Sequence, residues 1–341
     1  MARDLVVILL LLNVKQEVNM GSLRNYLPLV LFITATASVA GERIDKSMSL
    51  GSITNVTIEN LRGEVTITGT SGDTVSVMGE LDDKAEGFTF EKSGSRIIIK
   101  VEVPQGNHNG WGNNGSELSI EIPQHVRVNF KGVSSDINIS KFSHGSEIQT
   151  VSGDINAKYL QQQIELATVS GNIESNNLAG KIRLSSVSGD IHDRNSSGRA
   201  HFKTISGSLS SSSSANEISA NTVSGDIDLR LADIDELIVS TVSGEFNSQL
   251  SLNDNGLLKM SSVSGDLSVA FKNKVQASFN LKANAGGDII NRLSSAKAKK
   301  AKYGPSSKLS FETGKAKHRN KIAGSARRSA VLARLAVGFH Y

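Results

Sequence analysis

The chain has 341 residues, with 37 Lys and Arg against 33 Asp and Glu, and it is long enough for one or two domains with a sizeable core. Hydrophobic residues make up 38% of it, which together with 31 Gly is ordinary for a globular protein and too apolar for a disordered one. The complete lack of Cys excludes a disulfide framework, zinc sites built with Cys, a thiol nucleophile and a lipidated Cys anchor.

Two apolar runs open the chain. The first, Leu5–Leu12, is too short to span a bilayer. The second follows Met20 and has the order of a secretory signal peptide: a basic residue, an apolar run and a small-x-small site, in Arg24, Leu27–Ala37 and Ser38–Ala40. We therefore predict a doubtful extension over residues 1–19 and a signal peptide over 20–40, cleaved between Ala40 and Gly41. The mature chain is then periplasmic, secreted or at the cell surface, with no later segment long enough for a transmembrane helix.

Residues 41–131 are predicted to form an N-terminal β cap with the first rungs of a larger stack. Ile53–Thr68 and Thr74–Met78 alternate in polarity like strands. Arg96–Val103 and Glu117–Ile122 flank a loop rich in Gly and Asn, which predicts a hairpin with a long tip. Such a cap would block an open sheet edge that otherwise recruits other chains.

A pentapeptide related to Val-Ser-Gly-Asp-Ile recurs through the middle of the chain. Its copies begin at Val133, Val151, Val169, Val187, Ile205, Val223, Val242 and Val263, and a degenerate ninth begins at Ala285. The first five intervals are all 18 residues, and the next three are 19, 21 and 22. A fixed period in this range is typical of stacked supersecondary units.

The local pattern identifies the repeated unit as a coil of short strands. Val, Gly and Ile alternate with Ser and Asp, which predicts that the apolar residues share one inward face. A second apolar pair, such as Ile164 and Leu166, precedes most copies at a parity that requires a corner before the next Val. We predict an all-β fold, a single-stranded β-solenoid (β-helix) with 18-residue coils over residues 132–313. Its Gly row supplies a bulge or a positive φ that a β-carbon would obstruct.

This succession of rungs behind a signal peptide resembles the bacterial family usually labelled putative adhesin, a domain of unknown function. The opening rung Asn60–Ile67 and the segment Gly304–Phe311 fit the same pattern, so the resemblance covers about residues 45–313. It implies an exported β-solenoid in the bacterial envelope. It implies no catalytic or binding residue, because none is established for the family.

The C-terminal part departs from the pattern. No further rung follows Gly314, and Lys315–Tyr341 contains seven Lys and Arg and no acid. Residues 314–341 are therefore interpreted as a basic tail, in which out-of-frame translation or an unrelated segment replaces the final rungs. The charge is divided accordingly: residues 292–341 hold 13 Lys and Arg against one acid, and the other 291 hold 24 against 32. The pI near 9.1 thus says little about the partners of the body.

The position after Gly forms a polar row: Asp136, Asp154, Asn172, Asp190, Ser208, Asp226, Glu245, Asp266 and Asp288. Carboxylates stacked at coil spacing repel one another unless a cation binds, which makes Asp154, Asp190 and Asp226 candidate ligand-binding residues. The alternative, which we favour, is that these side chains accept hydrogen bonds from corner N–H groups, since Asn172 and Ser208 would serve equally.

Two further features invite a functional interpretation. Trp111, in the loop rich in Gly and Asn, either stacks on a sugar ring or folds back onto the cap, and is a candidate ligand-binding residue. The Ser row that begins at Ser134 is predicted to be structural, because eight equivalent serines cannot each have a catalytic His and Asp. The seven His form no zinc motif.

The sequence therefore predicts a non-enzymatic, exported β-solenoid that acts as a structural or adhesion module in the bacterial envelope, with no cofactor and no metal. Its expected partner is an envelope protein or glycan. Nucleic acid is not expected, because the basic run Lys297–Lys302 lacks interleaved aromatics. The alternative is a polysaccharide-binding or polysaccharide-processing β-helix enzyme, which would need a cleft with convergent acids or bases. Handedness and oligomeric state stay open.

Overall fold

The structure, a computed structural model, describes residues 41–104, 115–284, 286–314, 320–326 and 330–334. Over these ranges the chain forms 24 β-strands and no helix, so the predicted all-β class is confirmed. A helix with the length and hydropathy to cross a bilayer is likewise absent from the described ranges.

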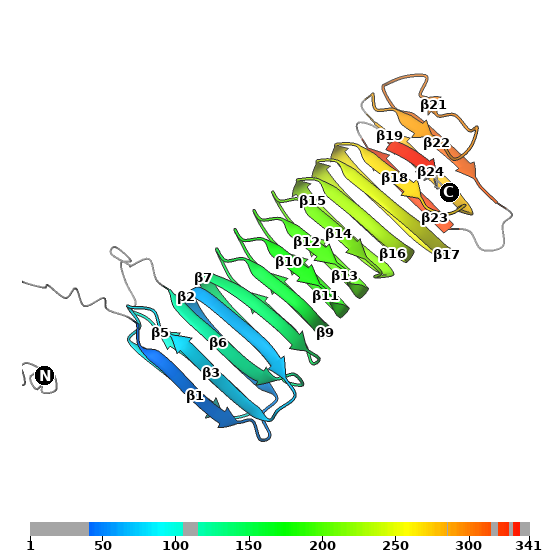
Figure 1. The fold of residues 1–341 in the computed structure, drawn as a ribbon. Helices are drawn as coiled ribbons and strands as arrows, with labels where there is room; N and C mark the ends of the chain where they lie inside the picture. The colour runs from blue at the N-terminus through cyan, green and yellow to red at the C-terminus, as the bar shows by residue number, and fades with distance from the viewer. Residues whose placement is uncertain (1–40, 105–114, 285, 315–319, 327–329, 335–341) are drawn as a thin grey trace, which may run out of the picture. The chain divides into compact units, whose positions relative to one another are not determined.

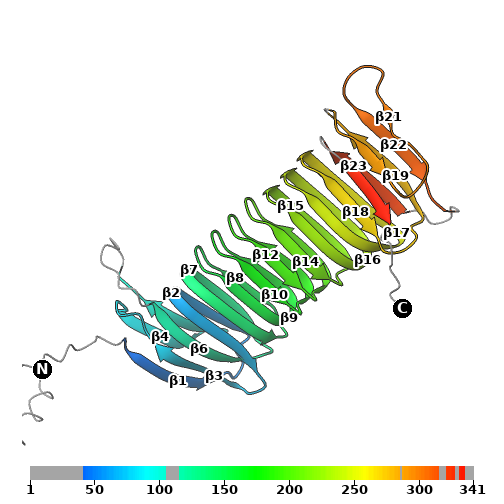
Figure 2. The same ribbon diagram turned by 45° about the horizontal axis from the view of Figure 1, so that its top comes forward.

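Six strands make the N-terminal end of the stack: β1 (Arg43–Ser49), β2 (Asn55–Thr70), β3 (Thr74–Glu80), β4 (Gly87–Ser93), β5 (Arg96–Glu102) and β6 (Ser116–Pro123). The first half of β2 pairs in parallel with β5 and the second half with β6. The predicted hairpin is therefore wrong, because β5 and β6 occupy the two sides of one coil. Strand β3 pairs antiparallel with β6, β1 with β3, and β4 with β5. These three strands therefore cover the edge of the parallel stack at β5 and β6 (Figure 2).

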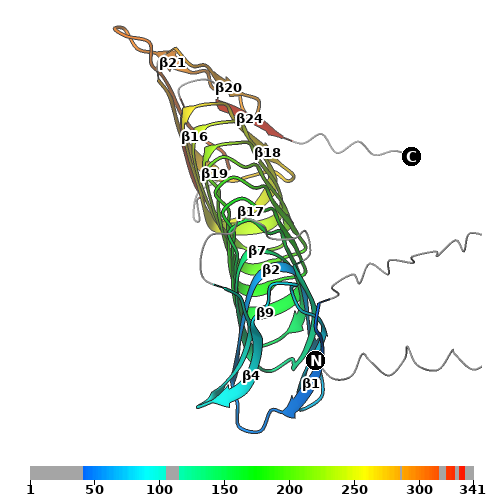
Figure 3. The same ribbon diagram turned by 90° about the vertical axis from the view of Figure 1, so that its left-hand side faces the viewer.

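Twelve strands form the stacked coils: β7 (Arg127–Phe142), β8 (Ser146–Gln149), β9 (Ile155–Ala167), β10 (Ile173–Asn176), β11 (Ala179–Ser185), β12 (Ile191–Arg194), β13 (Ser197–Lys203), β14 (Leu209–Ser213), β15 (Glu217–Ser224), β16 (Ile227–Ser243), β17 (Phe246–Ser264) and β18 (Leu267–Phe271). Each pass of the chain contributes to two parallel ladders (Figures 1 and 3). The first ladder aligns Ile155, Ile173 and Ile191 in register. The second aligns Leu166, Leu184 and Phe202. These pairings are consistent with the predicted solenoid.

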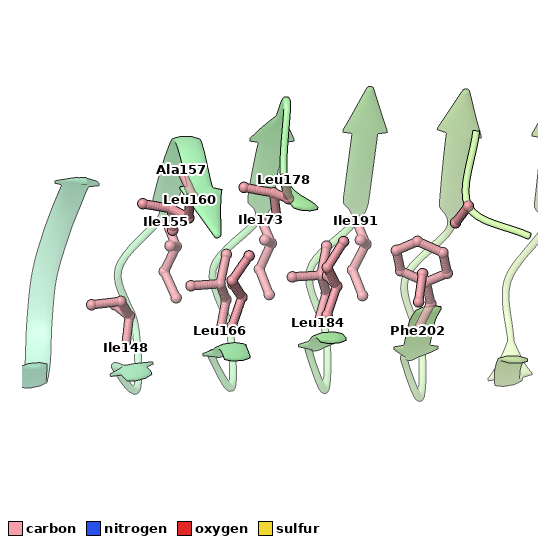
Figure 4. Packing of buried hydrophobic residues seen from close by; sticks show 14 of the residues in the cluster. Ile148, Ile155, Ala157, Leu160, Leu166, Ile173, Leu178, Leu184, Ile191 and Phe202 are labelled. Atoms are coloured by element: carbon pink, nitrogen blue, oxygen red, sulfur yellow. The ribbon is translucent and has the colours of Figure 1, made fainter. Parts of the chain in front are cut away.

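The core lies between the two ladders. In Figure 4, Ile155, Ile173 and Ile191 of the first ladder point toward the side chains of the second, among them Leu166 and Leu184. All five of these side chains are fully buried. Because each coil adds the same aliphatic side chains to a narrow interior, stability comes from contacts between neighbouring coils rather than from a central globular core.

Six strands follow at the C-terminal end: β19 (Ala277–Ala283), β20 (Ile289–Asn291), β21 (Lys299–Lys300), β22 (Ser307–Glu312), β23 (Asn320–Ala326) and β24 (Ala330–Arg334). Strand β23 lies between β17 and β19, parallel to both, and β24 pairs in the same way with β18 and β20. The segment expected to be a tail thus adds a coil inside the stack, with Ile322 buried. Residues 315–319, 327–329 and 335–341 of that segment lie outside the described residues.

Candidate functional site: the coil corner and its exposed edge

A buried hydroxyl fixes the corner that leads from the second ladder to the first. Thr168 Oγ1 donates to the Gly153 carbonyl oxygen of the preceding coil at 3.1 Å and accepts the Gly171 N–H at 3.1 Å. Ser186 makes both bonds one coil further on, at 3.1 Å to Gly171 and 2.9 Å from Gly189. In the coils from Thr150 to Thr204 the structural repeat therefore begins with the hydroxyl residue before Val or Ile. The equivalent hydroxyls of Thr222, Thr241 and Ser262 are buried but make no hydrogen bond within the described residues. Sequence analysis missed this position, although Thr or Ser precedes seven consecutive copies, from Thr150 to Ser262.

Glycine is required at the corner because consecutive coils approach closely there. A β-carbon on Gly171 would lie 1.9 Å from the Gly153 carbonyl oxygen, and one on Gly189 would lie 1.8 Å from that of Gly171. The predicted obstruction to a β-carbon is thus confirmed. Later corners differ, since Gly225 and Gly244 have φ of 149° and 139°.

The polar row holds the backbone of the next coil. Asp136 Oδ1 accepts the Asp154 N–H at 2.9 Å, and Asp154 Oδ1 accepts the Asn172 N–H at 2.7 Å. Asn172 and Asp190 repeat the bond to the following coil at 2.9 and 2.8 Å, and Asp226 accepts the Glu245 N–H at 2.8 Å. This arrangement supports the backbone-capping interpretation, with the bond running between coils rather than within one corner. Among the described residues, no group of three or more His, Asp or Glu could hold a metal ion.

The Val of the repeat faces solvent, which corrects the prediction that it faces the core. Val151 N and Ser152 N both donate to the Val133 carbonyl oxygen, at 3.1 and 2.7 Å. Two consecutive N–H groups that converge on one acceptor break the two-residue alternation of an extended strand. Val and Ser therefore both point outward, whereas the following Gly and Ile return to the interior.

The exposed side chains form a continuous row, here called the valine edge. It consists of Val133, Val151, Val169, Val187, Ile205, Val223, Val242 and Val263. Their exposed fractions run only from 37% at Val187 to 47% at Val223. At about 4.8 Å per coil, eight positions extend over roughly 34 Å. Single exposed apolar residues are common, but an aligned row of eight is a candidate interaction surface.

Other predicted site residues are placed as follows. Trp111 and Ala40 lie outside the described residues. Gly41, on the other side of the predicted cleavage point, donates its N–H to Glu80 Oε1 at 2.9 Å. Asp154 and Asp226 are exposed and Asp190 is half-buried, and all three take part in the backbone row described above.

A carboxylate is buried in the core, which sequence analysis did not identify. Asp193 is 1% exposed and accepts hydrogen bonds from the hydroxyls of Ser175, Ser196 and Ser211, at 2.7, 2.5 and 2.9 Å. Burial raises the pKa of Asp193, and the three hydroxyl donors oppose that rise. Asp193 lies two residues after the inward Ile191 on the same strand, so two-residue alternation could have predicted that it faces the core. Because the group is enclosed, it has no access to a substrate.

An ion pair fixes the cap. Asp82 is buried and accepts from both Nε and Nη2 of Arg62, the latter at 2.8 Å, and from the Lys84 N–H at 2.8 Å. Burial by itself would raise the pKa of Asp82, but these hydrogen bonds outweigh it and lower the pKa. The Asp82 N–H in turn donates to Ser116 Oγ at 3.0 Å, which connects this loop to the start of β6.

Comparison with known proteins agrees with the repeat pattern. A family model described as "Toastrack DUF4097" matches residues 53–322, and no curated protein matches. A solved "putative adhesin" from Parabacteroides merdae is 10% identical, with a TM-score of 0.48, and the match covers 68% of this chain and 97% of that one. Another from Parabacteroides distasonis is 13% identical, with a TM-score of 0.44 and coverage of 68% and 95%. A third from Bacteroides fragilis is 11% identical, with a TM-score of 0.32 and coverage of 86% and 97%.

The family match extends from Ile53, just before β2, to Ile322 in β23. It therefore includes the cap strands from β2 onward, the stacked coils and part of the basic segment, but not β1. It spans most of the chain and confirms the resemblance inferred from the rungs. The chain belongs to the DUF4097 toastrack family.

Proposed function

We propose that the protein is an exported, non-enzymatic β-solenoid of 18-residue coils that serves as an adhesion or interaction module in the bacterial envelope, with the valine edge as a contact surface. The observation that carries the proposal is the row of eight exposed β-branched side chains at coil spacing. Their outward apolar surface stays in contact with water unless a partner covers it, and the cost of that contact recurs at every coil.

The shape of the edge favours an extended partner. A row roughly 34 Å long and one side chain wide matches a polypeptide strand or a glycan chain better than a compact ligand. The serine row beside it supplies exposed hydroxyls, as at Ser152 and Ser170, which add hydrogen bonds to the apolar contact. The signal peptide predicted over residues 20–40 supports a location in the periplasm or at the cell surface.

The alternative, a polysaccharide-processing enzyme, has less support. A hollow of about 990 Å³ is lined by residues that include Glu59 and Lys100. These two already form an ion pair, with Lys100 Nζ 3.8 Å from Glu59 Oε2. A glycosidase requires two carboxyl groups on either side of a sugar bond, with one pKa raised. The carboxyl whose pKa is raised within the described ranges, Asp193, is enclosed in the core.

The proposal is tested by changing the edge without changing the coil. A variant with Val169→Ser, Val187→Ser and Ile205→Ser is compared with a matched control that carries Glu174→Ser, His192→Ser and Ser210→Ala, at exposed positions of β10, β12 and β14 outside the valine edge and the serine row. We expect the first variant to lose most of its cross-linking to envelope fractions and the control to keep it, with similar melting curves for both. Equal cross-linking by the two variants would contradict the proposal, as would cleavage of an envelope glycan by the purified protein.

A further inference from the structure

A cluster of basic side chains occupies the outer surface of the second ladder at two neighbouring coils. Strands β11 and β13 have six central outward positions, and five of them are basic: Lys181, Arg183, Arg199, His201 and Lys203, with Ser185 as the sixth. The two strands pair in parallel, so Lys181 lies beside Arg199 and Arg183 beside His201. We call this set the basic face. It stands out because the chain outside residues 292–341 has an excess of acids.

The positive charge of the basic face is only partly neutralised. Arg199 Nη2 lies 2.5 Å from Glu217 Oε2 on β15, and Glu165 on β9 stands next to Arg183 in the strand register. Among the described residues, no carboxylate lies within ion-pair distance of Lys181, Arg183 or Lys203. Three cations are therefore left without a paired anion.

His201 reports the local electrostatic field. Its ring is partly buried, and this desolvation lowers its pKa, with Arg183 and Lys203 lowering it further. A neighbouring anion would act in the opposite direction, because it stabilises the protonated ring. The imidazole is thus an internal probe for anion binding at this surface.

The basic face borders a hollow of about 390 Å³ that crosses four coils, from β11 through β13 and β15 to β16. Lys181, Arg183 and His201 line one end, and Glu217, Ser219 and Glu236 line the other. At about 4.8 Å per coil, its length is roughly 15 Å. One end therefore offers cationic donors, and the other offers carboxylate and hydroxyl acceptors.

We propose that this hollow binds a segment of an acidic polysaccharide, with a sugar carboxylate at the basic end and sugar hydroxyls at the acidic end. Guanidinium groups such as that of Arg183 pair with carboxylates through two parallel hydrogen bonds. Carboxylates such as that of Glu236 accept hydrogen bonds from hydroxyl groups. A small inorganic anion would use only the first set, whereas an acidic sugar chain uses both.

The proposal rests on the exported location given above, since an envelope polysaccharide is encountered outside the cytoplasm, but it uses none of the residues of the valine edge. Binding at one open site is weak, because exposed charge pairs contribute little in water. A long polysaccharide gains avidity when it also contacts neighbouring molecules of the protein.

The experiment measures binding of three oligosaccharide probes of matched length to the full chain by calorimetry: oligogalacturonate, dextran sulfate and uncharged dextran. The variant is Arg183→Glu, and its matched control is Arg194→Glu, the same change on β12 of the first ladder. We expect oligogalacturonate to bind, dextran to fail, and Arg183→Glu to weaken binding at least tenfold, with less than a twofold effect from Arg194→Glu. An NMR titration should show the pKa of His201 rising when oligogalacturonate is added.

Several results would overturn the proposal. These are equal binding of dextran, binding of Arg183→Glu within twofold of the unchanged chain, and a His201 pKa that does not move. Binding of dextran sulfate without oligogalacturonate would contradict the assignment of a carboxylate sugar. Cross-linking through the valine edge is measured on the same Arg183→Glu protein, so failure of this site is distinguishable from failure of the proposed function.

Discussion

Replacing the buried carboxyl of Asp193 by an amide should stabilise the stack at neutral pH. Asp193 is 1% exposed and accepts three hydroxyl hydrogen bonds, and no Lys, Arg or His lies within ion-pair distance of it in the described ranges. Burying an ionised group without a counter-charge is costly, and hydroxyl donors compensate only in part. In Asp193→Asn, Oδ1 still accepts from Ser175, and Nδ2 can donate to Ser211 once that hydroxyl rotates.

The sign of the pH dependence follows from the raised pKa of Asp193. The folded state holds this proton more tightly than the unfolded chain, so the contribution of Asp193 to stability falls as pH rises from the unfolded pKa toward the folded one. Near pH 3.5 the unchanged chain and Asp193→Asn should therefore be similarly stable. At neutral pH the variant should be more stable by about 1–3 kcal/mol, the usual cost of leaving a buried polar group incompletely compensated. For about 300 folded residues, that gain corresponds to a rise in melting temperature of roughly 2–5 °C.

The assay is thermal unfolding between pH 3.5 and 8, combined with hydrogen exchange of β10, β12 and β14, because repeat stacks respond locally to a local change. Asp190→Asn is the control: it neutralises a half-buried carboxyl in the same coil and keeps the oxygen that accepts the Ser208 N–H at 2.8 Å. If the difference in melting temperature between the unchanged chain and Asp193→Asn stayed constant with pH, or shrank as pH rose, the reasoning would be refuted.

Two further predictions concern the corner and the cap. Gly189→Ala places a β-carbon 1.8 Å from the Gly171 carbonyl oxygen and should lower the free energy of unfolding by roughly 3 kcal/mol or more, measured by thermal unfolding. Gly72→Ala is the control and should cost little, because no atom lies within 4 Å of its added β-carbon. Equal melting temperatures for the two variants would contradict the close approach. Asp82→Asn removes the charge paired with Arg62, so hydrogen exchange should rise in residues 80–86. Since the folded pKa of Asp82 is lowered, its stabilising effect is present above the unfolded pKa and lost as pH falls through the folded one. If the hydrogen-exchange protection of residues 80–86 in the unchanged chain did not fall on acidification, this prediction would be wrong.

The sequence alone predicted the burial of those side chains that follow the two-residue alternation of a strand. Leu166 and Leu184 are buried because two-residue alternation holds over the last residues of β9 and β11, which pair in register. Val169 is exposed because the corner breaks that alternation, and this break depends on hydrogen bonds to the previous coil. The predicted hairpin of β5 and β6 was wrong for a similar reason. Alternation of polarity indicates a strand, but it does not indicate whether the neighbouring strand is parallel or antiparallel. The insertion of β23 between β17 and β19 depends on contacts between segments far apart in the chain, which no local pattern records.

The basic face could not be identified along the chain either, because its residues come together only when β11 and β13 are placed in register. In a stacked fold, a side chain repeated at every coil has a common structural explanation, as the Gly row and the Asp row show. An outward column that changes from Glu165 to Arg183 and His201, and then to Ser219, has no such explanation, since outward positions are not constrained by the core. Departures from the repeat on the solvent side are therefore where a specific ligand site is best sought in this protein. The valine edge, which repeats a β-branched side chain at eight successive coils, is suited to partners that are themselves repetitive.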